Sequence, residues 1–222
     1  MIVDDPRYAI VEDVFSDDEL APVVAALDGH LASRSRAGAR HVLAVPQVRA
    51  LAGDPRLIDL AACFVGPAQP FRATLFDKSA SANWLVAWHQ DRALPMRAQV
   101  DAPGWGPWST KVGILYAHAP ASALARVVAL RVSLDPSTDA NGPLRVLPGT
   151  HRHGLLDEAA VERLGREIAP VSCTVDAGGV VALRPLLLHA SSKSTSDARR
   201  RVLHIEYAAA TSFGPGLDLA VG

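Results

Sequence analysis

The sequence has little cysteine, little lysine and no long apolar run. Its 222 residues include two cysteines, Cys63 and Cys173, which are too few for a disulfide framework. We expect both to be buried free thiols in a reducing compartment. No apolar stretch approaches the ~20 residues that a membrane-spanning helix needs, so we expect no membrane partner. The opening residues MIVDDPRYAI lack a basic segment followed by an apolar run, and we expect no signal peptide and a cytoplasmic location.

The sequence also lacks an excess of charge of either sign. The formal net charge is −1 and acidic and basic residues are interspersed, although arginine greatly outnumbers lysine. This distribution excludes the basic face that is typical of nucleic-acid-binding proteins. Apolar residues make up 49% of the chain, which excludes an intrinsically disordered protein. A length of 222 residues suits one well-cored domain.

The first third of the sequence is predicted to be largely helical. The segment YAIVEDVFSDDELAPVVAALDGHL begins with a short strand-like run and turns into a helix. Ser16 and Glu19 have the spacing of a capping box, and the apolar residues that follow keep a helical period. A second helical zone covers about 48–65. It is divided at Gly-Asp-Pro, where Asp54 can cap a helix that has Pro55 at its first position.

From Phe71 onward the pattern changes to short β-prone runs. Segments such as FRATLF, RVVALRVSLD, GGVVALRP and RRVLHIEYA alternate with Gly, Pro, Asn and Asp, a pattern typical of a sandwich or barrel. One helical insert, LLDEAAVERLGREI, has an apolar face of Ala160, Val161, Leu164 and Ile168. We therefore predict one mainly β domain over 1–222, with a helical N-terminal part of about 1–68 and a β core of about 69–210.

The stretch WLVAWHQDRALPMR contains the first pair of chemically suggestive residues. Alternate residues of a strand face the same way. His89 and Asp91 are thus expected to share a face with Leu85 and Ala87, while Gln90 points away. An imidazole and a carboxylate on one face can share a divalent ion. From this pair alone, an ordinary polar strand is an equally good interpretation. By the same alternation, Trp84 and Trp88 are assigned to the outer face, under the N-terminal helices.

A third metal ligand must come from another part of the chain. His189 ends the apolar run of GGVVALRPLLLHASS beside small polar residues, so it can face a cavity. Arg200 follows eleven residues later at the start of the next strand, where a turn would bring it into the same cavity. His151 and His153 form a rival pair in PGTHRHG, but no carboxylate lies nearby in sequence and turn hydrogen bonding is favoured. The remaining histidines carry no comparable signal: His30, His41, His118 and His204.

Two histidines and one carboxylate on one face of a metal are the signature of non-haem Fe(II) oxygenases. Such sites often need a bidentate co-substrate that supplies electrons. A dicarboxylate such as 2-oxoglutarate can chelate iron with one end and needs a fixed cation at the other. Arginine suits this task because its planar guanidinium stays charged and binds a carboxylate through two hydrogen bonds.

The order of these motifs resembles the phytanoyl-CoA dioxygenase family of Fe(II)/2-oxoglutarate oxygenases. The resemblance rests on His89-Gln90-Asp91, then NGPLRVLPGTHRHG, then GGVVALRPLLLHASS and RRRVLHIEYA, and it extends from about Tyr8 to Tyr207. It implies a double-stranded β-helix, a jelly-roll or cupin-like barrel with N-terminal helices. It also implies Fe(II), 2-oxoglutarate and O2 as cofactor and co-substrates, and hydroxylation of a small molecule with release of succinate and CO2.

The resemblance further implies a role for individual residues. His89, Asp91 and His189 would bind iron, Arg200 would bind the far carboxylate of 2-oxoglutarate, and Ser191 would donate a hydroxyl to that carboxylate. Lys78 is a candidate partner for the near carboxylate. A carboxylate at Asp91 favours hydroxylation, because halogenases of this superfamily have a small residue there to admit chloride. By strand alternation, Arg200 should share a face with His204 and Glu206, and Arg201 should point away. These four orientations are read from the strand pattern and not from the resemblance.

The substrate is not evident from the sequence. Trp105 and Trp108 lie in DAPGWGPWSTKVG after the candidate metal strand. They can shape a pocket for a flat or apolar substrate, or they can anchor a long loop, and both interpretations stay open. The chain is short for the family, which gives no reason to expect a CoA thioester. Two alternatives to a hydroxylase also remain: a jelly-roll metal-binding or sensor protein without turnover, and a cupin-type metalloenzyme that does not use 2-oxoglutarate. No oligomeric state is predicted.

Overall fold

A computed structural model describes residues 8–30 and 38–222. The strands are β1 (Tyr8–Val11), β2 (Gly38–Arg40), β3 (Gln69–Lys78), β4 (Val86–His89), β5 (Ala93–Met96), β6 (Trp108–Lys111), β7 (Ile114–His118), β8 (Val127–Ser133), β9 (Leu144–Val146), β10 (Val171–Cys173), β11 (Val180–Leu183), β12 (His189–Ser191) and β13 (Arg200–Ala208). The helices are α1 (Asp17–His30), α2 (Pro46–Ala52), α3 (Pro55–Val65), α4 (Ala121–Leu124) and α5 (Glu158–Glu167), with 3-10 turns η2 (Val42–Ala44), η3 (Asp139–Asn141) and η4 (Thr150–His153).

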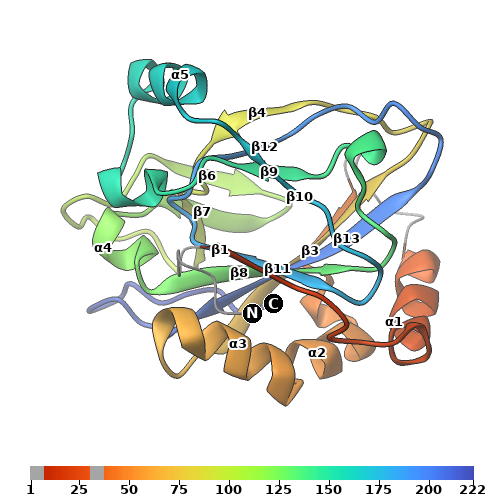
Figure 1. Cartoon of the computed structure of the whole chain (residues 1–222). Coiled ribbons are helices and arrows are strands. Elements are labelled where there is room, and N and C mark those ends of the chain that lie inside the picture. Colours follow the sequence, from red (N-terminus) through yellow and green to blue (C-terminus); the bar gives the residue numbers. More distant parts are fainter. Residues whose placement is uncertain (1–7, 31–37) are drawn as a thin grey trace.

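Three antiparallel sheets form the body of the molecule. The largest has the strand order β1-β11-β8-β13-β3-β2, the second β10-β9-β12-β4 and the smallest β5-β7-β6, and none of these orders closes into a ring. Buried side chains of β8 and β11 pack against those of β9 and β10, so the first two sheets face each other across an apolar layer. This arrangement confirms the predicted mainly β, jelly-roll architecture with helices in its N-terminal part (Figure 1).

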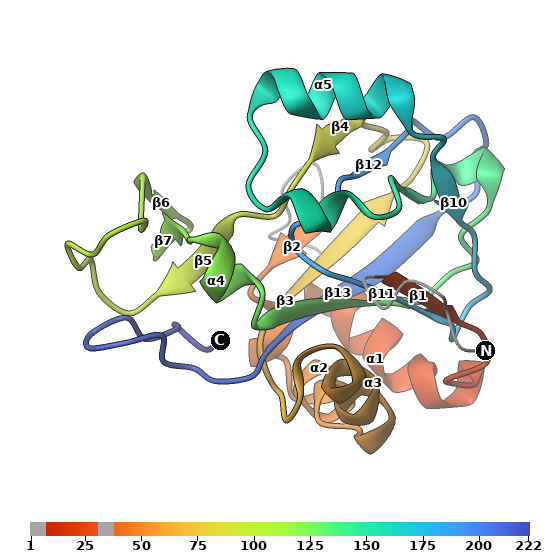
Figure 2. The same ribbon diagram turned by 60° about the vertical axis from the view of Figure 1, so that its left-hand side comes forward.

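The N-terminal helices cover the outer face of the six-stranded sheet (Figures 1 and 2). The predicted start of α1 is confirmed, because the Glu19 carboxylate accepts a hydrogen bond from the Ser16 N–H at 2.8 Å. The predicted division of the second helical zone is also confirmed. The Asp54 carboxylate accepts from the Arg56 N–H at 2.9 Å, and Pro55 is the first residue of α3.

The N-terminal part also supplies both edges of the six-stranded sheet. β1 pairs with β11, with Tyr8 opposite Leu183, and β2 pairs with β3, with Gly38 opposite Phe76. The sequence indicated β1 but not β2, because a strand of three residues is too short to show an alternating pattern. The β core therefore includes residues that precede position 69.

Helix α5 lies over the four-stranded sheet, on the side of the molecule opposite α1–α3 (Figure 2). Its predicted apolar face is confirmed, and it packs with Trp88, Leu147, Leu156 and Leu188. The placement of Trp88 under the N-terminal helices was wrong. Trp88 does lie on an outer face, but β4 belongs to the four-stranded sheet, whose outer face is covered by α5.

The small sheet projects from one end of the molecule and packs on the segment that follows β13 (Figure 2). Trp105 and Trp108 are partly buried there, and the Trp105 ring lies 5.7 Å from that of Phe213. Neither belongs to the lining of the cavity beside the metal group, and their packing favours the loop-anchor interpretation over the substrate-pocket one.

The structure also bears on the cysteines and on the expected lack of a membrane-spanning helix. Both cysteines are free, as expected, but Cys63 is exposed, because it lies on the side of α3 away from the buried Leu57 and Ala61. Across residues 8–30 and 38–222, every helix is too short or too polar to cross a bilayer.

Candidate metal centre

The pairing of β4 with β12 brings two histidines together. His89 and His189 are direct partners in the antiparallel register, although they lie a hundred residues apart in sequence. A β-bulge follows, so that Ser191 lies opposite Val86. This irregularity corrects the simple alternation expected for this strand: Leu85 and Ala87 are exposed, and Val86 lines the inner cavity.

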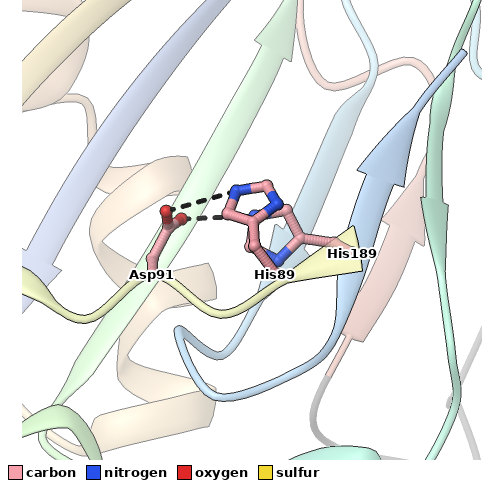
Figure 3. A group of neighbouring side chains, drawn as sticks. All are labelled: His89, Asp91 and His189. Atoms are coloured by element: carbon pink, nitrogen blue, oxygen red, sulfur yellow. Dashed lines mark ion pairs between the residues drawn. The ribbon is translucent and has the colours of Figure 1, made fainter. Parts of the chain in front are cut away.

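Asp91 follows the end of β4 and completes the group (Figure 3). Its Oδ2 lies 3.4 Å from His189 Nε2 and its Oδ1 lies 3.8 Å from His89 Nε2. One donor atom from each of the three residues lies within 4.8 Å of the others, and the residues described in the structure contain no second group of this kind. Ligands about 2.1 Å from a metal and at right angles lie about 3 Å apart, so small side-chain rotations suffice to bind one ion.

Backbone carbonyls orient both imidazoles. His89 Nδ1 lies 2.9 Å from the Ala87 carbonyl oxygen and His189 Nδ1 lies 2.8 Å from that of Leu187. A carbonyl only accepts, so each Nδ1 carries the proton and each Nε2 presents a lone pair to the shared point. Burial lowers the pKa of His89, which favours the neutral, metal-binding form. The donor set and its tautomers therefore fit a divalent transition metal.

The charge of Asp91 results from two opposing effects. Burial alone would raise the pKa of this carboxyl, but in the absence of a metal the charge and hydrogen bond of His189, when that ring carries both protons, lower it well below its usual range. The carboxylate thus stays ionised and available to a cation. Its backbone N–H donates to the Pro185 carbonyl at 2.9 Å, which ties the segment after β4 to the one before β12.

Gln90 supports the segment that joins His89 to Asp91. Its amide donates to the carbonyls of Gly154 and Leu186, both at 2.8 Å, and its oxygen accepts from the Leu156 N–H at 3.0 Å. The middle residue of the His-Gln-Asp motif therefore holds the segment after β4 against the segments that contain Gly154, Leu156 and Leu186.

The PGTHRHG block supports the site without supplying a ligand to it. Thr150 Oγ1 accepts from the Leu188 N–H at 2.9 Å and donates to the Leu147 carbonyl at 2.8 Å, directly before His189. His151 is buried and His153 is exposed in η4, and neither belongs to the three-residue metal group.

We predict that His151→Ala leaves the iron content of the protein unchanged, because His89, Asp91 and His189 form the group without it. Iron bound per chain, measured after anaerobic loading and desalting, checks this. His89→Ala is the matched histidine variant and should lose iron. Loss of iron in a folded His151→Ala protein would restore the rival His151/His153 site.

A cavity of about 390 Å³ lies beside the metal group, between the two large sheets. The three candidate ligands, Ser191 and Arg200 all line it. Trp84 also lines it, which corrects its assignment to the outer face: Trp84 precedes the first residue of β4, so strand alternation does not extend to it. As predicted by alternation, Arg200, His204 and Glu206 face this cavity, and Arg201 points elsewhere, to Asp135 at 2.8 Å.

The NGP segment holds the Arg200 end of the cavity. The Arg200 guanidinium is buried and donates through Nε to the Asn141 carbonyl at 3.2 Å, while Ser191 Oγ donates to the Gly142 carbonyl at 2.9 Å. Gly142 has φ 69°, and a Cβ there would lie 2.3 Å from the Ser192 oxygen. Burial, with the field of Arg131, lowers the pKa of Arg200 to about 10.

Lys78 lies behind Arg200 and is absent from the cavity lining. The two residues are cross-strand partners on β3 and β13. Lys78 Nζ donates to Ser191 Oγ at 2.9 Å and to the Ser192 carbonyl at 2.5 Å. Burial, followed by the charge of Arg200, lowers its pKa to about 8. The structure thus groups Lys78 with Ser191 and Arg200.

Arg131 and Arg72 are among the cavity arginines that were missed from the sequence. Arg131 is buried on β8 opposite His204 on β13, and its Nη1 lies 3.2 Å from His204 Nδ1. Burial lowers the pKa of His204 to about 3, so its neutral ring accepts this hydrogen bond. Arg72 on β3 forms a buried ion pair with Glu206. A charged residue inside the otherwise apolar run RVVALRVSLD was the available signal for Arg131.

The family model for phytanoyl-CoA dioxygenase (PhyH) matches residues 8–202, most of the chain. The chain belongs to the phytanoyl-CoA dioxygenase family. The three metal-group residues, Ser191 and Arg200 all lie within the matched residues.

Individual relatives agree with this family. The chain is 28% identical over 182 residues to L-proline trans-4-hydroxylase of Streptomyces griseoviridis, a match that covers 69% of this chain and 59% of that enzyme. The match thus spans less than two thirds of the relative's length. Two crystal structures share the fold. AviO1 from Streptomyces viridochromogenes has a TM-score of 0.69 at 24% identity, with 96% of this chain and 93% of that chain covered. EctD from S. alaskensis has a TM-score of 0.70 at 22% identity, with 100% and 89% covered.

Proposed function

We propose that this member of the phytanoyl-CoA dioxygenase family is an Fe(II)- and 2-oxoglutarate-dependent dioxygenase that hydroxylates a small molecule, with release of succinate and CO2. The observation that carries the proposal is the convergence of His89, Asp91 and His189 at one wall of a cavity that also contains Arg200. Iron held by the three residues would supply the redox chemistry that couples decarboxylation of 2-oxoglutarate to hydroxylation.

The cavity contains a cation for each end of 2-oxoglutarate. We assign the far carboxylate to Arg200 and Ser191, and we assign Lys78 to the same end, where it holds Ser191 and adds positive charge. The near carboxylate is assigned to Arg131, which replaces Lys78 in that role. Arg131 lines the cavity, and the charge of Asp91 acts on it against the effect of burial, which lowers its pKa to about 10.

The protein's own groups mainly orient the reactants. The Ala87 and Leu187 carbonyls hold the imidazole tautomers, and buried arginines hold the co-substrate. Phe76, Val86 and Leu144 give the cavity an apolar portion that limits water near the metal. A cupin-type enzyme without 2-oxoglutarate would leave the buried Arg200 without a task. We also propose a cytoplasmic location, which the two free thiols support.

Formation of the ternary complex tests this function. Addition of Fe(II) and 2-oxoglutarate to the protein under anaerobic conditions should produce the visible charge-transfer band of the chelate. Omission of either component should remove the band. Succinate release upon admission of O2, measured across a panel of small molecules, then separates an enzyme from a metal-binding sensor. Absence of the band in the wild-type protein would contradict the proposed function.

A further inference from the structure

The cavity lining carries a large excess of positive charge. Six side chains in it are permanently cationic, whereas Asp91 and Glu206 are its two carboxylates. The cations are Arg40, Arg72, Arg92, Lys111, Arg131 and Arg200. Like charges around one small cavity repel each other, and this cost persists unless a ligand offsets it. The excess therefore points to negatively charged ligands.

Iron and the co-substrate do not account for this excess. Fe(II) adds two positive charges and 2-oxoglutarate adds two negative ones, so the bound pair leaves the balance unchanged. Arg200 and Arg131 are engaged by the two carboxylates under the proposed function. Arg72 is already neutralised by its ion pair with Glu206. Three cations remain: Arg40, Arg92 and Lys111.

These three cations lie outside the ion pairs found within residues 8–30 and 38–222. Arg92 donates to the Gln90 side-chain oxygen at 3.2 Å and to the Leu156 carbonyl, which are both neutral. Lys111 Nζ lies 5.5 Å from the centre of the Tyr116 ring. Arg40 is exposed at the end of β2. Each can therefore turn to an anion without giving up a carboxylate partner.

Side chains of β7 lie near the three cations. Tyr116 and His118 are alternate residues of this strand and both line the cavity. Tyr116 lies beside Lys111 and Arg72, and its hydroxyl is 3.3 Å from His41 Nε2. The pKa of His118 is lowered by burial and then by the charges of Arg92 and Lys111, which line the same cavity. The pKa of His41 is likewise lowered first by burial and then by the charges of Arg72 and Arg40.

We propose that the substrate is a small organic anion whose carboxylate or phosphate is bound by Arg40, Arg92 and Lys111, with the rest of the molecule extending toward the metal group. This inference rests on the proposed function, because it takes the cavity as the site of an oxygenase. It replaces the flat or apolar substrate considered from the sequence, since Trp105 and Trp108 lie outside the cavity.

The test uses the anaerobic protein loaded with Fe(II) and saturating 2-oxoglutarate. Hexanoate, hexyl phosphate and the neutral analogue hexanamide are titrated by calorimetry while the charge-transfer band is monitored. We expect hexanoate or hexyl phosphate to bind about tenfold or more tightly than hexanamide, and this preference should weaken as salt is raised. Whichever of the two anions binds more tightly indicates whether the substrate carries a carboxylate or a phosphate.

Two variants and one control test whether Arg40 and Lys111 cause the preference for anions. Arg40→Gln and Lys111→Gln should each weaken anion binding by about threefold to tenfold and leave hexanamide and the band unchanged. Arg49→Gln changes an exposed arginine of α2 outside the cavity and should have no effect.

Three results would overturn the inference. They are equal binding of anions and hexanamide by the wild type, an anion preference that survives in the Arg40→Gln/Lys111→Gln double variant, and an anion that binds only by displacing 2-oxoglutarate and erasing the band. In each of these cases the wild-type chelate band still forms, so the proposed function stands. If the band never forms, the proposed function fails, and the assignment of the bound anion as a substrate fails with it.

Discussion

Replacement of Asp91 by alanine is expected to abolish succinate release and to lower the iron content of the protein. Asp91 contributes the one carboxylate of the metal group, and its oxygens lie 3.8 Å from His89 Nε2 and 3.4 Å from His189 Nε2. Residues that merely orient a metal ligand typically contribute tenfold to a hundredfold to affinity or activity, so loss of a ligand should cost about a hundredfold or more. Iron stoichiometry and succinate release measure the two effects.

Asp59→Ala provides the matched control for this variant. Asp59 is an exposed carboxylate on α3, far from the metal group in the fold, and its loss should alter neither iron content nor activity. The Asp91 variant should retain the thermal transition of the wild type measured without metal. Unchanged activity in Asp91→Ala would show that His89-Gln90-Asp91 does not supply the ligand pair.

Replacement of Arg200 by methionine should raise the 2-oxoglutarate concentration that half-saturates the charge-transfer band. The guanidinium is buried beside Ser191 and Lys78, where the far carboxylate is assigned. Removal of one partner from a buried charged pair costs about 2–5 kcal/mol, roughly thirtyfold to a few thousandfold in affinity. Iron content should stay near the wild-type value, because Arg200 is not among the metal-group residues.

Arg199→Met is the matched control, because the two arginines are adjacent in sequence and differ in surroundings. Arg199 forms ion pairs with Asp77 at 2.9 Å and with Asp28 at 3.2 Å, and it does not line the cavity. Its loss should lower stability modestly and leave the half-saturation concentration unchanged. A band that persists undiminished in Arg200→Met at limiting 2-oxoglutarate would rule out the carboxylate assignment.

Local chemistry made the helices predictable. Ser16, Asp54 and the apolar face of α5 act within one or two turns of their own chain, so their signals are present in a short window of sequence. Strand β2 and the orientation of the Trp84 side chain could not be predicted from the sequence. A three-residue strand has no period to detect, and Trp84 lies before the first residue of β4, so its orientation depends on tertiary packing.

Some residues of the candidate site were likewise apparent from the sequence, and others were apparent only in the fold. The ligand residue types and the order of His89, Asp91, His189 and Arg200 were apparent from the sequence, because the motif order resembles a known family. Arg131 was not apparent, because it becomes part of the site only when β8 pairs with β13 and places it opposite His204. The position of Lys78 depended likewise on the register that sets it against Arg200.

The sequence by itself determined the class of protein and the candidate residues of its metal group, because these depend on residue chemistry and motif order. Tertiary structure decided which charges share the cavity. Arg40, Arg92 and Lys111 come from separate segments, and only the pairing of β2 with β3 and of β5 and β6 with β7 brings them to the same cavity. Electrostatic interactions depend on distance in space, so the inferred preference for an anionic substrate appears only in the folded chain.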